Sequence, residues 1–198
     1  MKTISINTKH SHFIGCWNLE NDNLCNEIIK FFETNKHLQK KGVSGSGKLN
    51  LKIKKTTDIS ISPNDLKNKK FNVFNEYISQ LHKCFLDYQN QWPFLKTMIK
   101  NIDIPSFNVQ KYSKSDHFAH RHSERTSLNT LHRLFAWMTY LNDVESSGQT
   151  NFSHYGIKIK PEIGKTLIWP AEWTHAHTGE ILKSGKKYII TGWMQFPI

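Results

Sequence analysis

The segment Ser106-Phe-Asn-Val-Gln-Lys-Tyr112 opens the part of the chain that decides the fold. Apolar and polar residues alternate along it, which is typical of a strand with one face toward a core. Similar short stretches, separated by glycines, follow at 135–141, 157–160, 166–169 and 188–196. Several short strands at regular spacing predict an antiparallel sandwich or barrel.

Upstream of this region the apolar spacing is helical. Leu24, Ile28 and Phe31 predict a helix over about 19–34, and a longer series of steps of three and four predicts a second helix from Phe71 to Tyr88, closed by Pro93. Alternating runs at 49–53 and 59–61 predict short strands between the helices. We therefore expect an α+β fold in which the N-terminal helices pack on one sheet.

Composition sets the class of protein. The chain has 198 residues, of which 37% are hydrophobic and 22% charged, as expected of one ordered domain. The sequence has no run of 18 apolar residues, which excludes a transmembrane helix, and its first residues lack the apolar region of a signal peptide, so we expect a cytoplasmic protein. Three cysteines, at 16, 25 and 84, are expected to be reduced, half-buried thiols rather than a disulfide or zinc framework.

The net charge is concentrated in one segment. Lys and Arg outnumber Asp and Glu by 27 to 16, a net charge of +11, and residues 36–70 alone carry ten lysines against Asp58 and Asp65. Such a patch is either solvated surface or a binding face. Because arginine usually supplies the contacts that recognise bases and phosphates, and this segment has none, it is a weak indication of nucleic-acid binding.

Histidines cluster in the C-terminal half. His122 and Glu124 are two residues apart, so on a strand both would point to one face. A third ligand, either His175 or His177, would complete two histidines and a carboxylate, the facial set of non-heme Fe(II) enzymes. A single His-x-Glu is often incidental, and His120, on the same strand face as His122, is either a supporting group or an alternative ligand.

Several further motifs follow one another after residue 106. They are Val109-Gln-Lys-Tyr112, His122-Ser-Glu124, Arg133 through Tyr140-Leu-Asn-Asp-Val144, Gly148-Gln-Thr-Asn-Phe152, residues 160–169, His177-Thr-Gly179 and Lys187-Tyr-Ile-Ile-Thr-Gly-Trp193. In this order and approximate spacing, the region from about 106 to the C-terminus resembles the 2-oxoglutarate/Fe(II)-dependent dioxygenase superfamily, in particular its prolyl-4-hydroxylase-like branch. The N-terminal hundred residues match only in general layout.

The resemblance implies a double-stranded β-helix (jelly-roll) core and a set of site residues. The metal ligands would be His122, Glu124 and His177. The 2-oxoglutarate site would consist of Lys187, which pairs with the far carboxylate, and of Tyr140, Thr191 and Tyr112. The substrate pocket would include Trp193, Trp173 and Arg133, although Trp173 can equally be a core aromatic and Arg133 a member of a structural ion pair. One residue departs from the family pattern, since the acidic ligand is usually Asp and Glu124 is one methylene longer.

The function implied is hydroxylation of a C–H bond with Fe(II), 2-oxoglutarate and O₂, with ascorbate as reductant and succinate and CO₂ as products. A peptidyl proline is the hypothesised substrate, within a wider class of protein, peptide or small-molecule substrates. The alternatives are a nucleic-acid-directed oxygenase on the same fold and a non-catalytic β-helix binding module. We expect residues 1–198 to form one domain, in which 1–105 provide helical support and a basic finger at 48–55, and 106–198 provide the metal-binding core.

Overall fold

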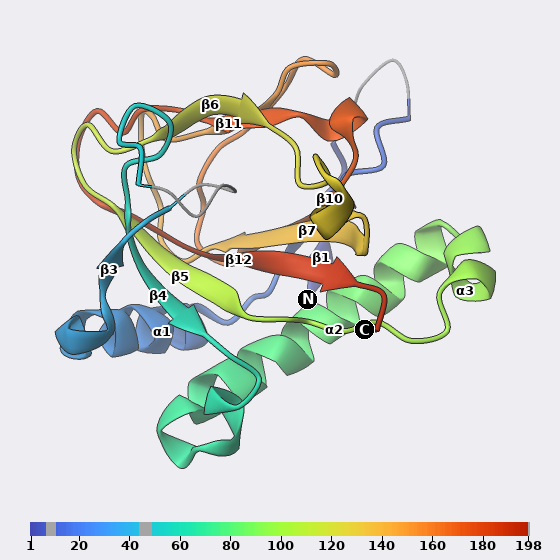
Figure 1. Cartoon of the computed structure of the whole chain (residues 1–198), viewed down its shortest axis with the longest axis horizontal. Coiled ribbons are helices and arrows are strands. Elements are labelled where there is room, and N and C mark those ends of the chain that lie inside the picture. Colours follow the sequence, from blue (N-terminus) through green and yellow to red (C-terminus); the bar gives the residue numbers. More distant parts are fainter. Residues whose placement is uncertain (7–10, 44–48, 198) are drawn as a thin grey trace.

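The computed structural model describes residues 1–6, 11–43 and 49–197 of the chain. Two antiparallel sheets lie face to face, and the helices cover the outer face of the larger one (Figure 1). Among the described residues, the larger sheet has eight strands, in the order β1 (Lys2–Thr3), β2 (Gly15–Asn18), β10 (Lys165–Pro170), β7 (Arg133–Tyr140), β12 (Lys187–Gln195), β5 (Phe107–Tyr112), β4 (Thr57–Ile61) and β3 (Lys40–Lys41).

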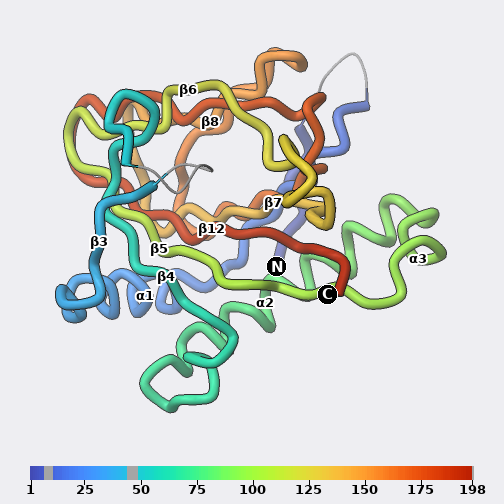
Figure 2. Tube along the Cα trace, in the orientation of Figure 1, coloured from blue at the N-terminus to red at the C-terminus, as the bar shows by residue number. Residues whose placement is uncertain are grey.

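The smaller sheet is built entirely from the C-terminal half of the chain. Its described strands run in the order β6 (Phe118–His122), β11 (His177–Gly179), β8 (Thr150–Phe152) and β9 (Ile157–Ile159). Figure 2 shows it stacked over the large sheet on the side opposite the helices. Two stacked antiparallel sheets with helices on one outer face confirm the expected α+β double-stranded β-helix.

The helices form where apolar residues share one face. They are α1 (Asp22–Thr34), α2 (Asn72–Gln91) and α3 (Phe94–Met98). The Asn21 side chain accepts a hydrogen bond from the Leu24 backbone N–H and so caps the first turn of α1. Buried residues of α1 and α2 join one hydrophobic cluster with the large sheet, in which the Tyr77 ring of α2 lies 5.7 Å from the Trp137 ring of β7. None of the described helices is both long enough and apolar enough to cross a membrane.

Strand alternation divides the interior into two clusters. On β12, Tyr188 and Ile190 belong to the cluster beneath the helices, whereas Ile189 belongs to the second cluster, between the two sheets. Because successive side chains of a strand point to opposite faces, Lys187, Thr191 and Trp193 share the face of Ile189. One face of the large sheet therefore packs against the helices, and the other face packs toward the smaller sheet and carries Lys187, Thr191 and Trp193.

A glycine allows side chains of two neighbouring strands to pack closely on the helix-covered face of the large sheet. A Cβ atom on Gly192 of β12 would lie 2.7 Å from Trp137 Cζ2 and 2.8 Å from Phe107 Cβ. Real Cβ atoms do not approach neighbours so closely, so any larger residue here would displace the Trp137 ring.

Two expectations need correction. The predicted strand at 49–53 is a turn, in which the backbone N–H groups of Ile53 and Lys54 both donate to the Asn50 carbonyl. The expected end of the second helix before Pro93 is confirmed, since α2 stops at Gln91 and Pro93 precedes the short helix α3. The three cysteines are fully buried free thiols rather than half-buried ones.

A buried chain of hydroxyl groups ties α2 to the large sheet. The Tyr77 hydroxyl lies 2.7 Å from Thr139 Oγ1, which lies 2.7 Å from Thr166 Oγ1 of β10. All three residues are almost completely buried, so a group that lost its partner would have no access to water.

We expect Tyr77→Phe to lower the free energy of unfolding by about 1 kcal/mol, because one buried hydrogen bond is lost while the rings still pack. Urea unfolding of Tyr77→Phe, Thr139→Val and the double variant measures the coupling. The double variant should be less destabilised than the sum of the two single variants. Strict additivity would show that the Tyr77–Thr139 bond contributes nothing.

Candidate metal centre and cosubstrate pocket

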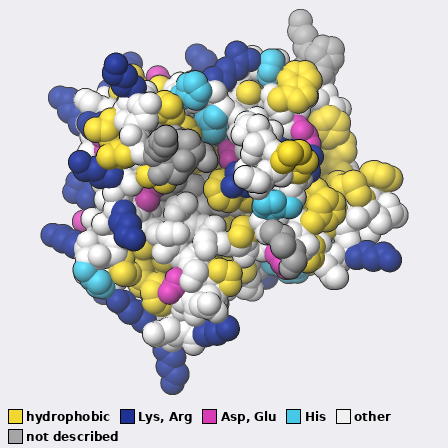
Figure 3. Space-filling view, in the orientation of Figure 1, with side chains coloured by type: hydrophobic (Ala, Val, Ile, Leu, Met, Phe, Trp, Pro, Cys, Tyr) yellow, Lys and Arg dark blue, Asp and Glu magenta, His cyan; other side chains and the backbone are white. Residues whose placement is uncertain are grey.

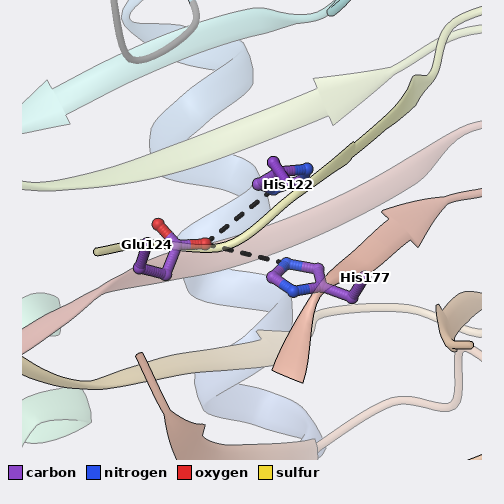
Figure 4. A group of neighbouring side chains, drawn as sticks. All are labelled: His122, Glu124 and His177. Carbon is purple, nitrogen blue, oxygen red and sulfur yellow. Dashed lines mark ion pairs between the residues drawn. The ribbon is translucent and has the colours of Figure 1, made fainter. Parts of the chain in front are cut away.

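The two sheets bring His122, Glu124 and His177 together. His122 ends β6 and His177 begins β11, and the two residues are directly paired across these strands. One donor atom from each of the three side chains lies within 4.8 Å of the others. Glu124 Oε1 is 3.8 Å from His122 Nε2 and 3.7 Å from His177 Nε2, as Figure 4 shows.

Glu124 reaches this position in a different way from the one expected. It lies just beyond β6, and its backbone N–H donates to the Ala171 carbonyl at 3.2 Å. Strand alternation therefore does not aim its side chain. A contact between two segments about 50 residues apart in the sequence does so instead.

Backbone carbonyls select the tautomer of both histidines. His122 Nδ1 is 2.8 Å from the His120 carbonyl oxygen, and His177 Nδ1 is 3.0 Å from the His175 carbonyl oxygen. A carbonyl can only accept, so each Nδ1 carries the proton and each Nε2 offers a lone pair toward Glu124.

Burial keeps both rings neutral. It lowers the pKa of His122 to about 4, assisted by the nearby His177 ring and opposed by Glu124. Burial also lowers the pKa of His177, again opposed by Glu124. Two neutral imidazoles are therefore present at pH 7, and metal ions bind this form.

Aromatic rings fix the orientation of the two histidines. The Phe118 ring stacks on His122 with the ring centroids 3.7 Å apart, and the Trp169 ring meets His177 edge-on at 5.1 Å. The Trp169 ring thus lies against one side of His177. Trp173 instead lies 69% exposed, with its ring 6.0 Å from that of exposed His154.

The structure distinguishes between the alternative ligands. His175 Nε2 lies 2.8 Å from the His12 carbonyl oxygen, and its Nδ1 lies 3.0 Å from Thr174 Oγ1, so the ring is engaged elsewhere. The His120 side chain is exposed. Both residues contribute to the cluster through their carbonyl oxygens, which hold the rings of His177 and His122.

Trp193 and Arg133 contact Glu124 directly. The Trp193 indole N–H donates to Glu124 Oε2 at 2.6 Å, and Arg133 Nη1 donates to the Glu124 carbonyl oxygen at 3.0 Å. The Arg133 guanidinium stacks on the Trp193 ring, 3.7 Å from its centroid. These two predicted pocket residues thus form the wall of the cluster next to its carboxylate.

Lys187 supplies a buried cation between the sheets. Its side chain donates to the Gly148 carbonyl oxygen at 2.8 Å and lies over the Tyr112 ring, 4.2 Å from the centroid. The residue is only 2% exposed, and burial lowers the pKa of its ammonium group to about 8. A buried cation with so few partners is well suited to pair with an incoming carboxylate.

Three further predicted residues with hydroxyl groups lie on β12 and on the two strands that pair with it. Tyr140 donates or accepts at 2.6 Å with Thr150 Oγ1, and Tyr112 donates to Gln110 Oε1 at 2.9 Å. Thr191 donates to the Trp137 carbonyl oxygen at 2.8 Å. Burial raises the pKa of both tyrosines above the usual value, so they remain neutral donors at physiological pH.

Three contributors were not identified from the sequence. Gln110 shares the strand face of Tyr112, so alternation could have revealed it. Thr150 and the Gly148 carbonyl come from the segment that leads into β8, and no local pattern signals their role. Gly148 has φ +74°, and a Cβ there would lie 3.3 Å from Lys187 Cδ, so the turn lets the backbone approach the lysine.

Two lysines of the finger segment, residues 48–55, are engaged in ion pairs. Figure 3 shows cationic side chains gathered on the side of the molecule where β3, β4 and α1 lie. Lys54 is buried and pairs with Asp58 at 2.7 Å, and Lys55 pairs with Asp116 at 3.0 Å. Lys54 also lies 5.7 Å from the centroid of the Phe118 ring, which stacks on His122. The finger thus adjoins the cluster, and Lys48, predicted to be part of it, falls outside the described residues.

The donor set fits iron and a keto acid. Two imidazole nitrogens with free lone pairs and one carboxylate oxygen form the facial set that non-heme Fe(II) enzymes use. The buried Lys187 ammonium group and its neighbouring hydroxyls fit the far carboxylate of 2-oxoglutarate. His122, Glu124 and His177 are therefore suited to hold the metal, and Lys187 the cosubstrate.

Comparison with known proteins agrees with this geometry. Residues 107–195 match the model of the 2OG-Fe(II) oxygenase superfamily. Among curated proteins the comparison finds no relative. The matched segment is slightly less than half of the chain and contains His122, Glu124, His177 and Lys187.

Solved structures with a similar fold include prolyl hydroxylases. The viral collagen prolyl hydroxylase of Paramecium bursaria Chlorella virus-1, in its 2OG complex, shares 18% identity with a TM-score of 0.68 and covers 95% of this chain and 98% of its own. A Pseudomonas putida prolyl-4-hydroxylase shares 14% identity with a TM-score of 0.70 and covers 95% of both chains.

A third structure contains a bound peptide. It is a Trichoplax adhaerens prolyl hydroxylase in complex with a peptide from the oxygen degradation domain of hypoxia inducible factor, at 14% identity and a TM-score of 0.70, covering 93% of this chain and 84% of its own. At these identities the likeness establishes the fold, which is that of the prolyl-4-hydroxylase-like branch.

The lowered pKa of Lys187 makes stability depend on pH. The folded protein releases this proton near pH 8 and the unfolded chain near pH 10.5, so between these values the unfolded state binds more protons and the free energy of unfolding rises with pH. We expect Lys187→Met to remove this contribution, roughly 1 kcal/mol per pH unit across that window. Urea unfolding of both proteins from pH 7 to pH 10 isolates it, because all other groups are shared. Equal pH slopes would contradict the assignment.

Proposed function

We propose that the protein is an Fe(II)- and 2-oxoglutarate-dependent dioxygenase that hydroxylates a C–H bond. The observation that carries this proposal is the position of His122, Glu124 and His177 at one end of the space whose interior holds Lys187. The segment from Gly148 to Phe152 connects the two parts: Gly148 contacts Lys187, Thr150 contacts Tyr140, and the Phe152 ring lies 5.4 Å from the His177 ring.

Different residues of the chain would bind the metal, bind the cosubstrate and exclude water. Fe(II), 2-oxoglutarate and O₂ would supply the oxidising chemistry, with succinate and CO₂ as products of the cosubstrate. His122, Glu124 and His177 would hold the metal through one atom each. Lys187 neutralises the far carboxylate, while Tyr140 and Thr191 offer hydroxyl groups to the same end. Buried aromatic residues keep water from this space.

A peptidyl proline is the substrate we propose. Support comes from the fold shared with prolyl hydroxylases and from the peptide held by the Trichoplax structure. Ion pairing at Lys54 and Lys55 lowers the charge that the finger could present to phosphates, so we favour a peptide over a nucleic acid. Ascorbate is the proposed reductant.

We further propose that residues 1–198 act as one domain. The N-terminal segment contributes β2 next to β10 and β4 next to β5 in the large sheet. The core at 106–198 would lose these neighbours, and the α2 helix beneath them, if it were separated.

Metal-ligand variants test the activity. Purified protein with Fe(II), 2-oxoglutarate and ascorbate should form succinate slowly without substrate. His122→Ala and His177→Ala should lower that rate at least ~100-fold, because a lost ligand costs more than a lost supporting group. His37→Ala, a change at an exposed histidine, is the matched control. Succinate formation that survives both ligand changes would overturn the proposal.

Lys187→Met separates cosubstrate binding from metal binding. Loss of the charge-assisted hydrogen bond should raise the KM for 2-oxoglutarate ~10- to 100-fold, while the Kd for Mn²⁺, measured by titration calorimetry without cosubstrate, stays the same. An unchanged KM would show that another group binds the far carboxylate.

Peptide screening tests the substrate. Proline-containing peptides should gain the mass of one oxygen atom, with hydroxyproline as the product, and should stimulate succinate release. Stimulation by single-stranded oligonucleotides and not by peptides would favour the nucleic-acid alternative.

A further inference from the structure

The two oxygens of the Glu124 carboxylate have different environments. Oε1 faces both histidine Nε2 atoms, at 3.8 and 3.7 Å, whereas Oε2 accepts a hydrogen bond from the Trp193 indole at 2.6 Å. A glutamate has one more rotatable bond than an aspartate, so its carboxylate can turn either oxygen, or both, toward a metal ion. The indole N–H removes that freedom.

Arg133 holds the indole and the backbone of Glu124 at the same time. Its guanidinium stacks on the Trp193 ring and donates to the Glu124 carbonyl oxygen. Arg133 lies at the start of β7 and Trp193 lies on the adjacent strand β12, opposite Ala136. Arg133 and Trp193, which together we call the clamp on Glu124, therefore lie on two paired strands of the large sheet rather than on the loop that carries Glu124.

We infer that Trp193 and Arg133 are positioning residues that commit Glu124 to binding metal through Oε1 alone. This inference rests on the proposed function. One oxygen from Glu124 leaves three positions on an octahedral ion, which a keto acid and O₂ require, whereas a carboxylate bound through both oxygens would occupy one of them. The indole offsets the extra methylene that distinguishes Glu124 from the aspartate usual in the family.

Trp193→Phe tests the clamp, because it keeps an aromatic ring for Arg133 and removes only the N–H group. The Kd for Mn²⁺, measured by titration calorimetry without 2-oxoglutarate, should rise ~10- to 100-fold, the usual cost of losing a group that orients a ligand. Trp92→Phe, at the C-terminal end of α2 next to Phe13, is the matched control and should bind Mn²⁺ like the wild type.

Infrared spectroscopy gives a readout that a general loss of packing would not produce. Metal-induced difference spectra of protein labelled with ¹³C-glutamate report the carboxylate stretches of the metal-bound glutamate. The wild type should show the wide splitting of a carboxylate bound through one oxygen, and Trp193→Phe the narrow splitting of one bound through both. If Trp193→Phe does not fold, Arg133→Met provides the same comparison and should shift the spectrum in the same direction.

A double-mutant cycle links the effect to the length of Glu124. The shorter side chain of Glu124→Asp draws the carboxylate away from the indole, so Trp193→Phe should cost less Mn²⁺ affinity in that background than in the wild type. Wild-type Mn²⁺ affinity and wide splitting in Trp193→Phe would overturn the inference and leave the proposed function intact. Absence of Mn²⁺ binding by the wild type would instead overturn the proposed function, and the inference with it.

Discussion

The pairing of β6 with β11 is the constraint on which the site depends. It places His122 directly opposite His177, and the backbone carbonyls at 120 and 175 then orient the two rings. The strands are short and lie in the smaller sheet, whose Phe152, Ile157 and Ile159 belong to the second cluster, between the sheets. This cluster supports their pairing, and the other face of the large sheet packs against α1 and α2.

The two faces of the large sheet carry different kinds of side chains, because successive residues of a strand point to opposite faces. Alternation along β12 sends Tyr188 and Ile190 to the helices and Lys187 to the space between the sheets. Burying a lysine in that space is unfavourable, as its lowered pKa shows, and the free energy of the helical cluster compensates for it. The free-energy cost of burying Lys187 would be offset by a bound carboxylate, which pairs with its ammonium group.

Much of the fold followed from periodicity. Both long helices and the strands predicted at 106–112, 135–141, 157–160, 166–169 and 188–196 lie close to elements of the structure, because a 3.6-residue or two-residue apolar period reflects which side of an element is buried. The strands β6, β8 and β11 were not predicted from periodicity. The turn at 49–53 was missed since its apolar side chains alternate like those of a strand, while the Asn50 carbonyl closes the backbone into a turn. Gln110 could have been found by alternation, but the position of Gly148 next to Lys187 could not, because it depends on a contact between residues 39 positions apart.

The sequence by itself determined the identity and order of the groups in the proposed site: two histidines, a carboxylate and a lysine, within a segment rich in predicted strands. Only the tertiary structure decided how these side chains are arranged relative to one another. It showed that His177 rather than His175 faces Glu124, because the His175 ring is hydrogen-bonded to the N-terminal segment. It also showed that Glu124 is oriented by Ala171, Trp193 and Arg133 rather than by strand alternation. These contacts join segments far apart in the chain, and local patterns carry no information about such distances.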